Sequence, residues 1–140
     1  MSTKIRTKIS RRNKWWIPEK RYLELYWFCQ QYNDWIKERS TLLSKGIPET
    51  SYKEKEVQET VKVDSRVEEI AIRCAELSKN IELIESTAYK TDPELYRYIL
   101  LGVTSKIGFT YMETVLDIPC CKATYYDRYR HFYYLLDKEK

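Results

Sequence analysis

The chain has 140 residues with only three glycines and four prolines, and 33% of its residues are charged, a profile that favours helices over sheet. Its length allows one domain, with or without an extension, and is sufficient to bury a hydrophobic core without disulfides or metals. No run approaches the roughly 18 apolar residues of a membrane span, and no signal peptide is apparent, so we expect a cytoplasmic protein without a membrane partner and with free cysteines.

Residues 1–17 are predicted to form a basic arm. The first 21 residues contain eight lysines and arginines against one acid, Glu19. Such a block is typical of a mobile segment whose commonest partner is nucleic acid, although a solvated terminus without a partner has the same composition. The candidate DNA contacts in the arm are Arg11, Arg12 and Lys14. Trp15 and Trp16 follow them and either stack on bases or anchor the arm on the helical body; we favour the anchor.

The region 18–89 is predicted to contain two long helices. Pro18 suits a helix start, and the first helix is expected over 18–44, with Trp27 widening its apolar stripe. A polar linker over 46–61 leads to a second helix over 62–89, whose apolar positions form an uninterrupted heptad stripe: Val63, Val67, Ile70, Cys74, Leu77, Ile81, Ile84 and Ala88. Such a stripe requires a partner helix. An antiparallel hairpin within the chain is the simplest arrangement, and a coiled-coil dimer is the alternative.

The region 90–140 is predicted to be a helix-turn-helix unit. The expected elements are a helix over 93–103 capped by Thr91 or Asp92, a turn over 106–108, a helix over 109–117, and a helix over 122–138. Pro119 separates the last two helices, because it cannot continue a helix, and Asp117 is the turn-prone residue at the bend. A helix, a short turn and a second helix can place the second helix in the DNA major groove. The predicted fold class is therefore all-α.

Six of the nineteen residues in "IPCCKATYYDRYRHFYYLL" are aromatic, and helical spacing separates two faces of this last helix. Tyr125, Tyr129, Phe132 and Leu136 are predicted to face the core. The outer or rim side chains include the candidate DNA contacts Lys122, Thr124, Arg128, Arg130 and His131. The first three lie in the first two turns, where a recognition helix contacts base edges, whereas Arg130 and His131 are better placed for the DNA backbone.

The chain resembles the small late-gene transcription regulators of phages and prophages in Gram-positive bacteria, the RinA and ArpU type. The resemblance rests on "RYLELYWFCQQYNDWIKE", "VEEIAIRCAELSKNIELIESTA" and "ETVLDIP", and related prophage proteins end in a similar "DIPC…YYDRYR". The last part is also similar to the promoter-recognising helix-turn-helix of sigma factors. The resemblance covers most of residues 20–138 as a pattern of helices rather than identities, and the turn is longer than that of the family. It implies a non-catalytic DNA-binding activator or adaptor with recognition positions Lys122, Thr124 and Arg128.

The sequence argues against a metal site, a cofactor and an enzyme. Cys120 and Cys121 adjoin and His131 is the only histidine, so the paired ligand spacing of a zinc site is missing. Any nucleophile pair that needs histidine would have to use His131, and the chain has no glycine-rich phosphate loop.

The leading hypothesis is a phage or prophage transcription regulator that binds double-stranded DNA. Host RNA polymerase or another host protein is a further candidate partner, and a homodimer is one alternative for its assembly. Two other functions stay open. One is a DNA packaging component similar to a small terminase subunit, which would form a ring. The other is a phage-encoded inhibitor that uses aromatic patches to bind a host defence enzyme.

Overall fold

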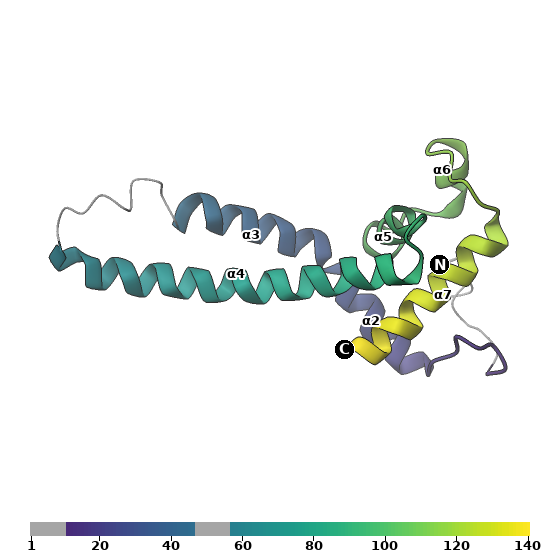
Figure 1. The fold of residues 1–140 in the computed structure, drawn as a ribbon, viewed down its shortest axis with the longest axis horizontal. Coiled ribbons are helices and arrows are strands. Elements are labelled where there is room, and N and C mark those ends of the chain that lie inside the picture. The colour runs from purple at the N-terminus through teal and green to yellow at the C-terminus, as the bar shows by residue number, and fades with distance from the viewer. Residues whose placement is uncertain (1–10, 47–56) are drawn as a thin grey trace. The chain divides into compact units, whose positions relative to one another are not determined.

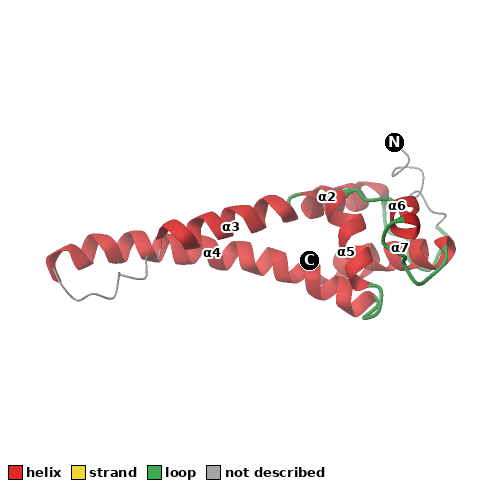
Figure 2. Cartoon of the chain, turned by 90° about the horizontal axis from the view of Figure 1, so that it is seen from above, coloured by secondary structure: helices red, strands yellow, loops and turns green. Residues whose placement is uncertain are grey.

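The computed structural model describes residues 11–46 and 57–140, and every regular element in that part of the chain is a helix (Figure 2). The helices, labelled in Figure 1, are α2 (Glu19–Gln30), α3 (Tyr32–Gly46), α4 (Val57–Thr91), α5 (Tyr96–Ser105), α6 (Phe109–Thr114) and α7 (Lys122–Glu139). The predicted all-α class is confirmed. Among the described residues, no helix combines the length and apolar character needed to cross a membrane.

The chain divides into two compact units. Unit 1 consists of Met1–Tyr32 and Leu83–Lys140, and unit 2 consists of Asn33–Glu82. Unit 1 therefore contains α2, α5, α6 and α7 together with the last turns of α4. Unit 2 contains nearly all of α3 and the longer part of α4.

Helices α2, α5 and α7 pack against one another and form the core of unit 1. The predicted inner face of α7 is confirmed, because Tyr125, Tyr129, Phe132 and Leu136 are all buried. Large aromatic rings of this kind remove much apolar surface from water.

A glycine permits the close approach of α5 to α7. A Cβ atom added to Gly102 would lie 2.0 Å from the hydroxyl oxygen of Tyr125, whose side chain is fully buried. The contact leaves no space for any other residue, since core side chains are packed at close to crystal density. Glycine is therefore required at position 102 by the close packing of α5 against α7, and not by the backbone conformation of a turn.

The predicted continuous helix over 18–44 is wrong, because α2 and α3 are separated at Gln31. The backbone N–H of Gln31 donates to the carbonyl of Phe28, three residues earlier, at 3.3 Å. The Gln31 side-chain amide donates to the carbonyl of Trp27, also at 3.3 Å. Side-chain donation of this kind replaces part of the helical ladder and ends the first helix. The prediction for Trp27 is also wrong: its side chain is 58% exposed rather than part of the core.

In unit 2, α3 and α4 run side by side in opposite directions (Figures 1 and 2). Arg73 forms an ion pair with Glu38 at 2.8 Å, and Arg39 donates to the hydroxyl of Ser78 at 3.0 Å. The predicted burial of Leu77 and Ile81 is confirmed, with each residue 1% exposed. Val67, Ile70 and Cys74, earlier in the same stripe, are only half-buried.

The predicted linker over 46–61 is too long at its C-terminal end, because α4 already begins at Val57. The rest of the linker, 47–56, lies outside the described residues, as does the side chain of Val63. The first turns of α4 carry mostly polar residues, so apolar periodicity gave no signal for this part of the helix.

The two short helices α5 and α6 differ from their predicted bounds. Asp92 does act as a cap, because its Oδ1 accepts the backbone N–H groups of Glu94 and Leu95 at 2.9 and 3.2 Å. The capped segment is a turn, however, and α5 begins only at Tyr96 instead of residue 93. Likewise α6 ends at Thr114 instead of residue 117, and Asp117 has a φ of 55°, the left-handed conformation suited to the predicted bend.

Candidate nucleic-acid interface

The outward face of α7 is defined by Asp127, His131 and Tyr134, which follow one another at helical spacings of four and three residues. All three side chains are half-buried, although they lie opposite the core-facing tyrosines. The side chain that covers them belongs to the segment that precedes α2.

Trp15 lies directly on this outward face. Its ring stacks on the His131 ring with centroids 3.8 Å apart and an interplanar angle of 15°. It meets the Tyr134 ring edge-on at 5.2 Å. Its indole N–H donates to the Oδ1 atom of Asp127 at 3.1 Å. The prediction that a tryptophan anchors the arm on the helical body is confirmed for Trp15.

A tight turn around Asn13 orients the anchor. The Asn13 side chain accepts the backbone N–H of Trp15 at 2.8 Å, and its carbonyl accepts that of Trp16 at 3.1 Å. The ammonium of Lys14 lies 5.0 Å from the centre of the Trp15 ring, and the Arg11 guanidinium lies 5.5 Å from that of Trp16. Asparagine side chains commonly stabilise such turns.

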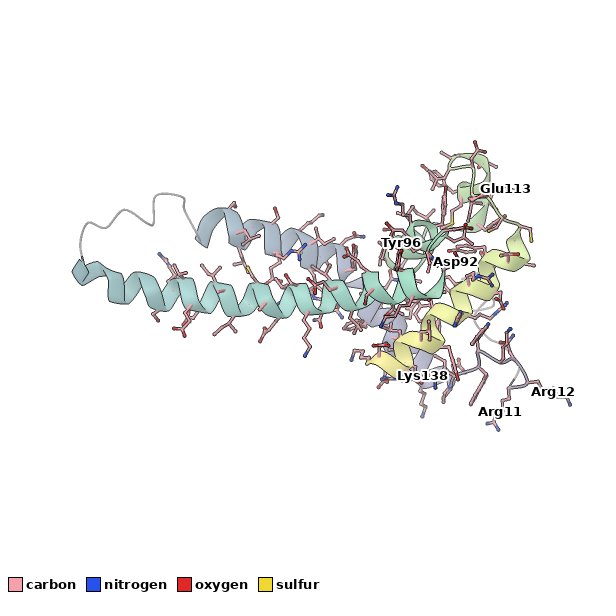
Figure 3. All side chains as sticks on the ribbon, viewed as in Figure 1. Arg11, Arg12, Asp92, Tyr96, Glu113 and Lys138 are labelled. Atoms are coloured by element: carbon pink, nitrogen blue, oxygen red, sulfur yellow. The ribbon has the colours of Figure 1, made fainter. Side chains whose placement is uncertain are left out.

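The candidate contacts of the arm therefore lie beside α7. Figure 3 shows Arg11 and Arg12 projecting outward from the segment that precedes α2. Both residues, as well as Lys14, are exposed. Because Trp15 fixes this segment on α7, the structure brings the three arm candidates and His131 to the same side of unit 1.

Arg128 lies on the rim of α7, as predicted, and is paired with two carboxylates; its contact with DNA bases stays a prediction. Its Nε donates to Asp92 at 3.0 Å and its Nη1 to Asp127 at 2.6 Å. Its side chain is 36% exposed, and that of Asp92 only 17%. The guanidinium therefore ties α7 to the corner between α4 and α5, near the labelled Asp92 in Figure 3. This is a structural contact that the sequence pattern did not indicate.

The Asp92 carboxylate is correspondingly stabilised in its ionised form. Burial by itself raises the pKa of Asp92. The hydrogen bonds from Arg128 and from the backbone N–H groups of Glu94 and Leu95 outweigh burial, so the pKa lies below its ordinary value.

His131 is held in an environment that favours its neutral form. Burial lowers the pKa of His131 below its ordinary value. The Asp127 carboxylate opposes this effect, whereas the positive charges of Arg128 and Lys14 add to it. In the docked arrangement His131 therefore acts as a stacking surface more than as a cation.

The first turn of α7 carries the two other predicted base contacts. Lys122 is exposed, and Thr124 is half-buried with its hydroxyl 3.3 Å from the Cys121 sulfur. The hydrogen bond with the Thr124 side chain and the backbone N–H groups of Thr124 and Ala123 lower the pKa of the Cys121 thiol. Lys122 thus extends into solvent at the helix end that favours anions.

Arg130, the remaining candidate, is half-buried rather than fully exposed. Its Nε atom is buried and makes no hydrogen bond to the described residues. On the same flank of α7, Asp137 pairs with Arg21 of α2 at 2.6 Å. This side of the helix mainly supports packing against α2.

The positive charge of the protein is concentrated in unit 1. Unit 1 has 16 basic and 10 acidic residues, a formal charge of +6, whereas unit 2 has 9 basic and 11 acidic residues, a formal charge of −2. The overall charge of +4 conceals this division. The predicted site residues all belong to the basic unit.

Sequence analysis missed a set of exposed aromatic and apolar side chains on unit 1. Trp27, Tyr89, Tyr111 and Val115 are all at least 49% exposed. Each of the four lies next to at least one other aromatic or apolar residue in the sequence. Periodicity alone therefore gave no means of separating them from the core.

In comparisons with family models, curated proteins and solved structures, no match to the chain was found.

Proposed function

We propose that the protein is a DNA-binding transcription regulator of phage or prophage origin that contacts double-stranded DNA through unit 1. The observation that carries this proposal is the division of charge, with +6 on unit 1 and −2 on unit 2. A duplex attracts cations along its phosphates, and release of its counterions supplies much of the binding free energy. The resemblance to phage late-gene regulators points to the same class of function.

The contacts divide into two groups in this proposal. Arg11, Arg12 and Lys14 contact phosphates, which positions the protein without reference to sequence. Lys122 and Thr124, in the first turn of α7, contact base edges. Arg128 is withdrawn from the second group, since it is already paired with two carboxylates.

Helices α6 and α7 act as the helix-turn-helix in this proposal, and α3 and α4 form a hairpin that does not contact DNA. The turn over 115–121 exceeds the three or four residues of the common motif. It contains Asp117 in a left-handed conformation and Pro119, which together redirect the chain into α7. Because α6 is short, α7 supplies all base contacts.

A salt titration of DNA binding tests the proposal. The anisotropy of a labelled duplex, either the DNA upstream of the protein's own gene or a random duplex of equal length, is measured between low and physiological salt. We expect binding that weakens steeply with salt, and tighter binding to the upstream duplex. Absence of binding to both duplexes at low salt would refute the proposal.

Lys122→Ala refines the test, with Lys79→Ala as control because both lysines are exposed. Loss of a base contact should weaken upstream binding by about 1–3 kcal/mol and affect the random duplex much less. Lys79 lies in unit 2, so its removal should leave both affinities unchanged. Equal loss on both duplexes would reassign Lys122 to the phosphates.

Binding to a host protein is the second candidate function, favoured by Trp27, which is 58% exposed. Large exposed aromatic side chains are common at protein interfaces. Failure of DNA binding would move this function to first place. The packaging alternative predicts a ring, so sedimentation of the free protein separates it from a monomeric or dimeric regulator.

A further inference from the structure

We propose that Trp15 is a latch that covers the outward face of α7 in the free protein, and that duplex DNA releases it by drawing the arm onto phosphates. The inference rests on the proposed function, which it extends by a closed and an open state.

The outward face is the accessible side of α7. The opposite side is buried in the core through Tyr129, Phe132 and their neighbours. One flank is tied to α2 by the ion pair of Asp137 with Arg21 at 2.6 Å. The other flank is tied to α4 by Glu139 with Lys90 at 3.4 Å and to the α4–α5 corner by Arg128. A ligand that meets the middle of α7 must therefore approach the outward face.

Trp15 occupies this outward face through three contacts of different kinds. It stacks on His131, meets Tyr134 edge-on and donates a hydrogen bond to Asp127. These residues extend over two turns of α7, in the middle of the helix that would enter a groove. A docked arm and a groove-bound helix thus compete for the same side chains.

Trp15 and the cations of the arm lie in one short segment. Lys14 precedes Trp15 directly and lies over its ring, and Arg11 and Arg12 are only three to four residues away. A phosphate chain that attracts these cations acts on the residue that covers α7. Release therefore requires no second ligand and no change in the core.

Two changes in the same segment should then have opposite effects. Removing the cations of the arm weakens DNA binding, because phosphate contacts are lost. Trp15→Ala retains those cations and abolishes the closed state, so it should strengthen binding of a random duplex by about three- to tenfold, the reciprocal of the open fraction. Trp15→Phe retains a stacking ring without the indole N–H. Its affinity for the random duplex should lie between those of the unmodified protein and Trp15→Ala.

Trp16→Ala is the matched control. It removes a neighbouring tryptophan that is also half-buried and lies beside Arg11. Its affinity for the duplex should equal that of the unmodified protein. Equal or weaker binding by Trp15→Ala, compared with the unmodified protein, would overturn the latch.

His131 is the only histidine of the chain, so its ring protons provide an unambiguous NMR signal for the closed state. Stacking on Trp15 at 3.8 Å should shift these protons upfield, and Trp15→Ala should move them downfield. At saturation with random duplex, the signal of the unmodified protein should leave its stacked position. A signal that remains stacked in a saturated complex would overturn the latch while leaving the proposed function intact.

The two proposals thus fail differently. If neither the unmodified protein nor Trp15→Ala binds the duplex at low salt, both the proposed function and the release of Trp15 by DNA are refuted. If both bind with equal affinity, only the latch is overturned.

Discussion

Unit 1 and unit 2 are both helical but differ in how they are held together. Among the described residues, 18 buried hydrophobic side chains belong to unit 1, and only Trp35, Leu77 and Ile81 belong to unit 2. Unit 1 also contains several cation–π contacts, for example those of Lys14 with Trp15 and of Lys138 with Tyr134. Unit 1 therefore combines a dense aromatic core with a surface where cations lie beside aromatic rings.

The comparison shows that the tyrosine-rich helix α7 has two kinds of side chain with different roles. Four tyrosines of α7 belong to the core of unit 1, namely Tyr125, Tyr126, Tyr129 and Tyr133. The cations of α7 differ from one another in their contacts. Arg128 supports the fold, whereas Lys122 remains exposed. A concentration of arginine and tyrosine on one helix therefore does not by itself indicate a continuous binding surface.

The largest expected loss of stability follows from truncating a buried side chain in each of the two units. Phe132→Ala removes a fully buried ring from unit 1 and should lower the free energy of unfolding by about 3–5 kcal/mol. Leu77→Ala in unit 2 should cost about 2–3 kcal/mol, because a two-helix contact can close partly around the cavity. Chemical denaturation of both variants measures the difference. A larger loss for Leu77→Ala would reverse the comparison.

The next effect tests the contact between α5 and α7. Gly102→Ala should destabilise the protein by about 1–3 kcal/mol, because the new methyl group meets the Tyr125 hydroxyl. Tyr125→Phe removes that oxygen, so the double variant should regain part of the loss in a double-mutant cycle. Additive losses would show that the clash is relieved by another movement.

A smaller effect on stability is expected for Arg128→Ala, which tests whether Arg128 stabilises the fold or contacts DNA. Arg128→Ala should lower stability by about 1 kcal/mol, a value appropriate for a partly exposed ion pair. Its effect on DNA affinity should be smaller than that of Lys122→Ala. Asp92 has a lowered pKa in the folded state, so its contribution is present at neutral pH and is lost as pH falls through its folded-state pKa. The contribution of Asp92 to acid unfolding should therefore be smaller in Arg128→Ala. If the free energy of unfolding of Arg128→Ala equals that of the unmodified protein, Arg128 does not stabilise the fold and is available to contact DNA.

The smallest effect concerns the pH dependence of arm docking. The His131 pKa is lowered in the folded state, so docking is fully favoured above the ordinary histidine value of about 6.5 and weakens as pH falls below it. The groups that face His131 are Asp127, Arg128 and Lys14. An NMR titration should give a pKa below the ordinary value that rises in Trp15→Ala. A pKa at or above the ordinary value in the unmodified protein would contradict the docked geometry.

The sequence predicted the elements with strong local patterns. The helix over 122–138 agrees closely with Lys122–Glu139, because Pro119 stops the preceding segment and aromatic residues recur at helical spacing. The buried face of α7 followed from the same spacing. In α4, the heptad stripe correctly indicated that Leu77 and Ile81 are buried.

The features that the sequence did not predict depend on residues far apart in the chain or on polar helix ends. Periodicity continues through Gln31 and so gave no sign of the break, which depends on a side-chain hydrogen bond. The contacts of Arg128 with Asp92 and of Trp15 with Asp127 join positions separated by 36 and 112 residues. Local spacing could classify Trp15 as an anchor but could not identify the helix that it meets.

The most direct test of DNA binding through unit 1 is a comparison of two charge-matched triple variants. R11A/R12A/K14A removes three cations from the arm, and K37A/R66A/K79A removes three exposed cations from unit 2. The slope of log affinity against log salt concentration is measured for each variant on the same duplex. We predict that the slope decreases by about 2–3 for the arm variant and stays unchanged for the unit 2 variant. Equal decreases in both variants, or a larger decrease in the unit 2 variant, would contradict the account.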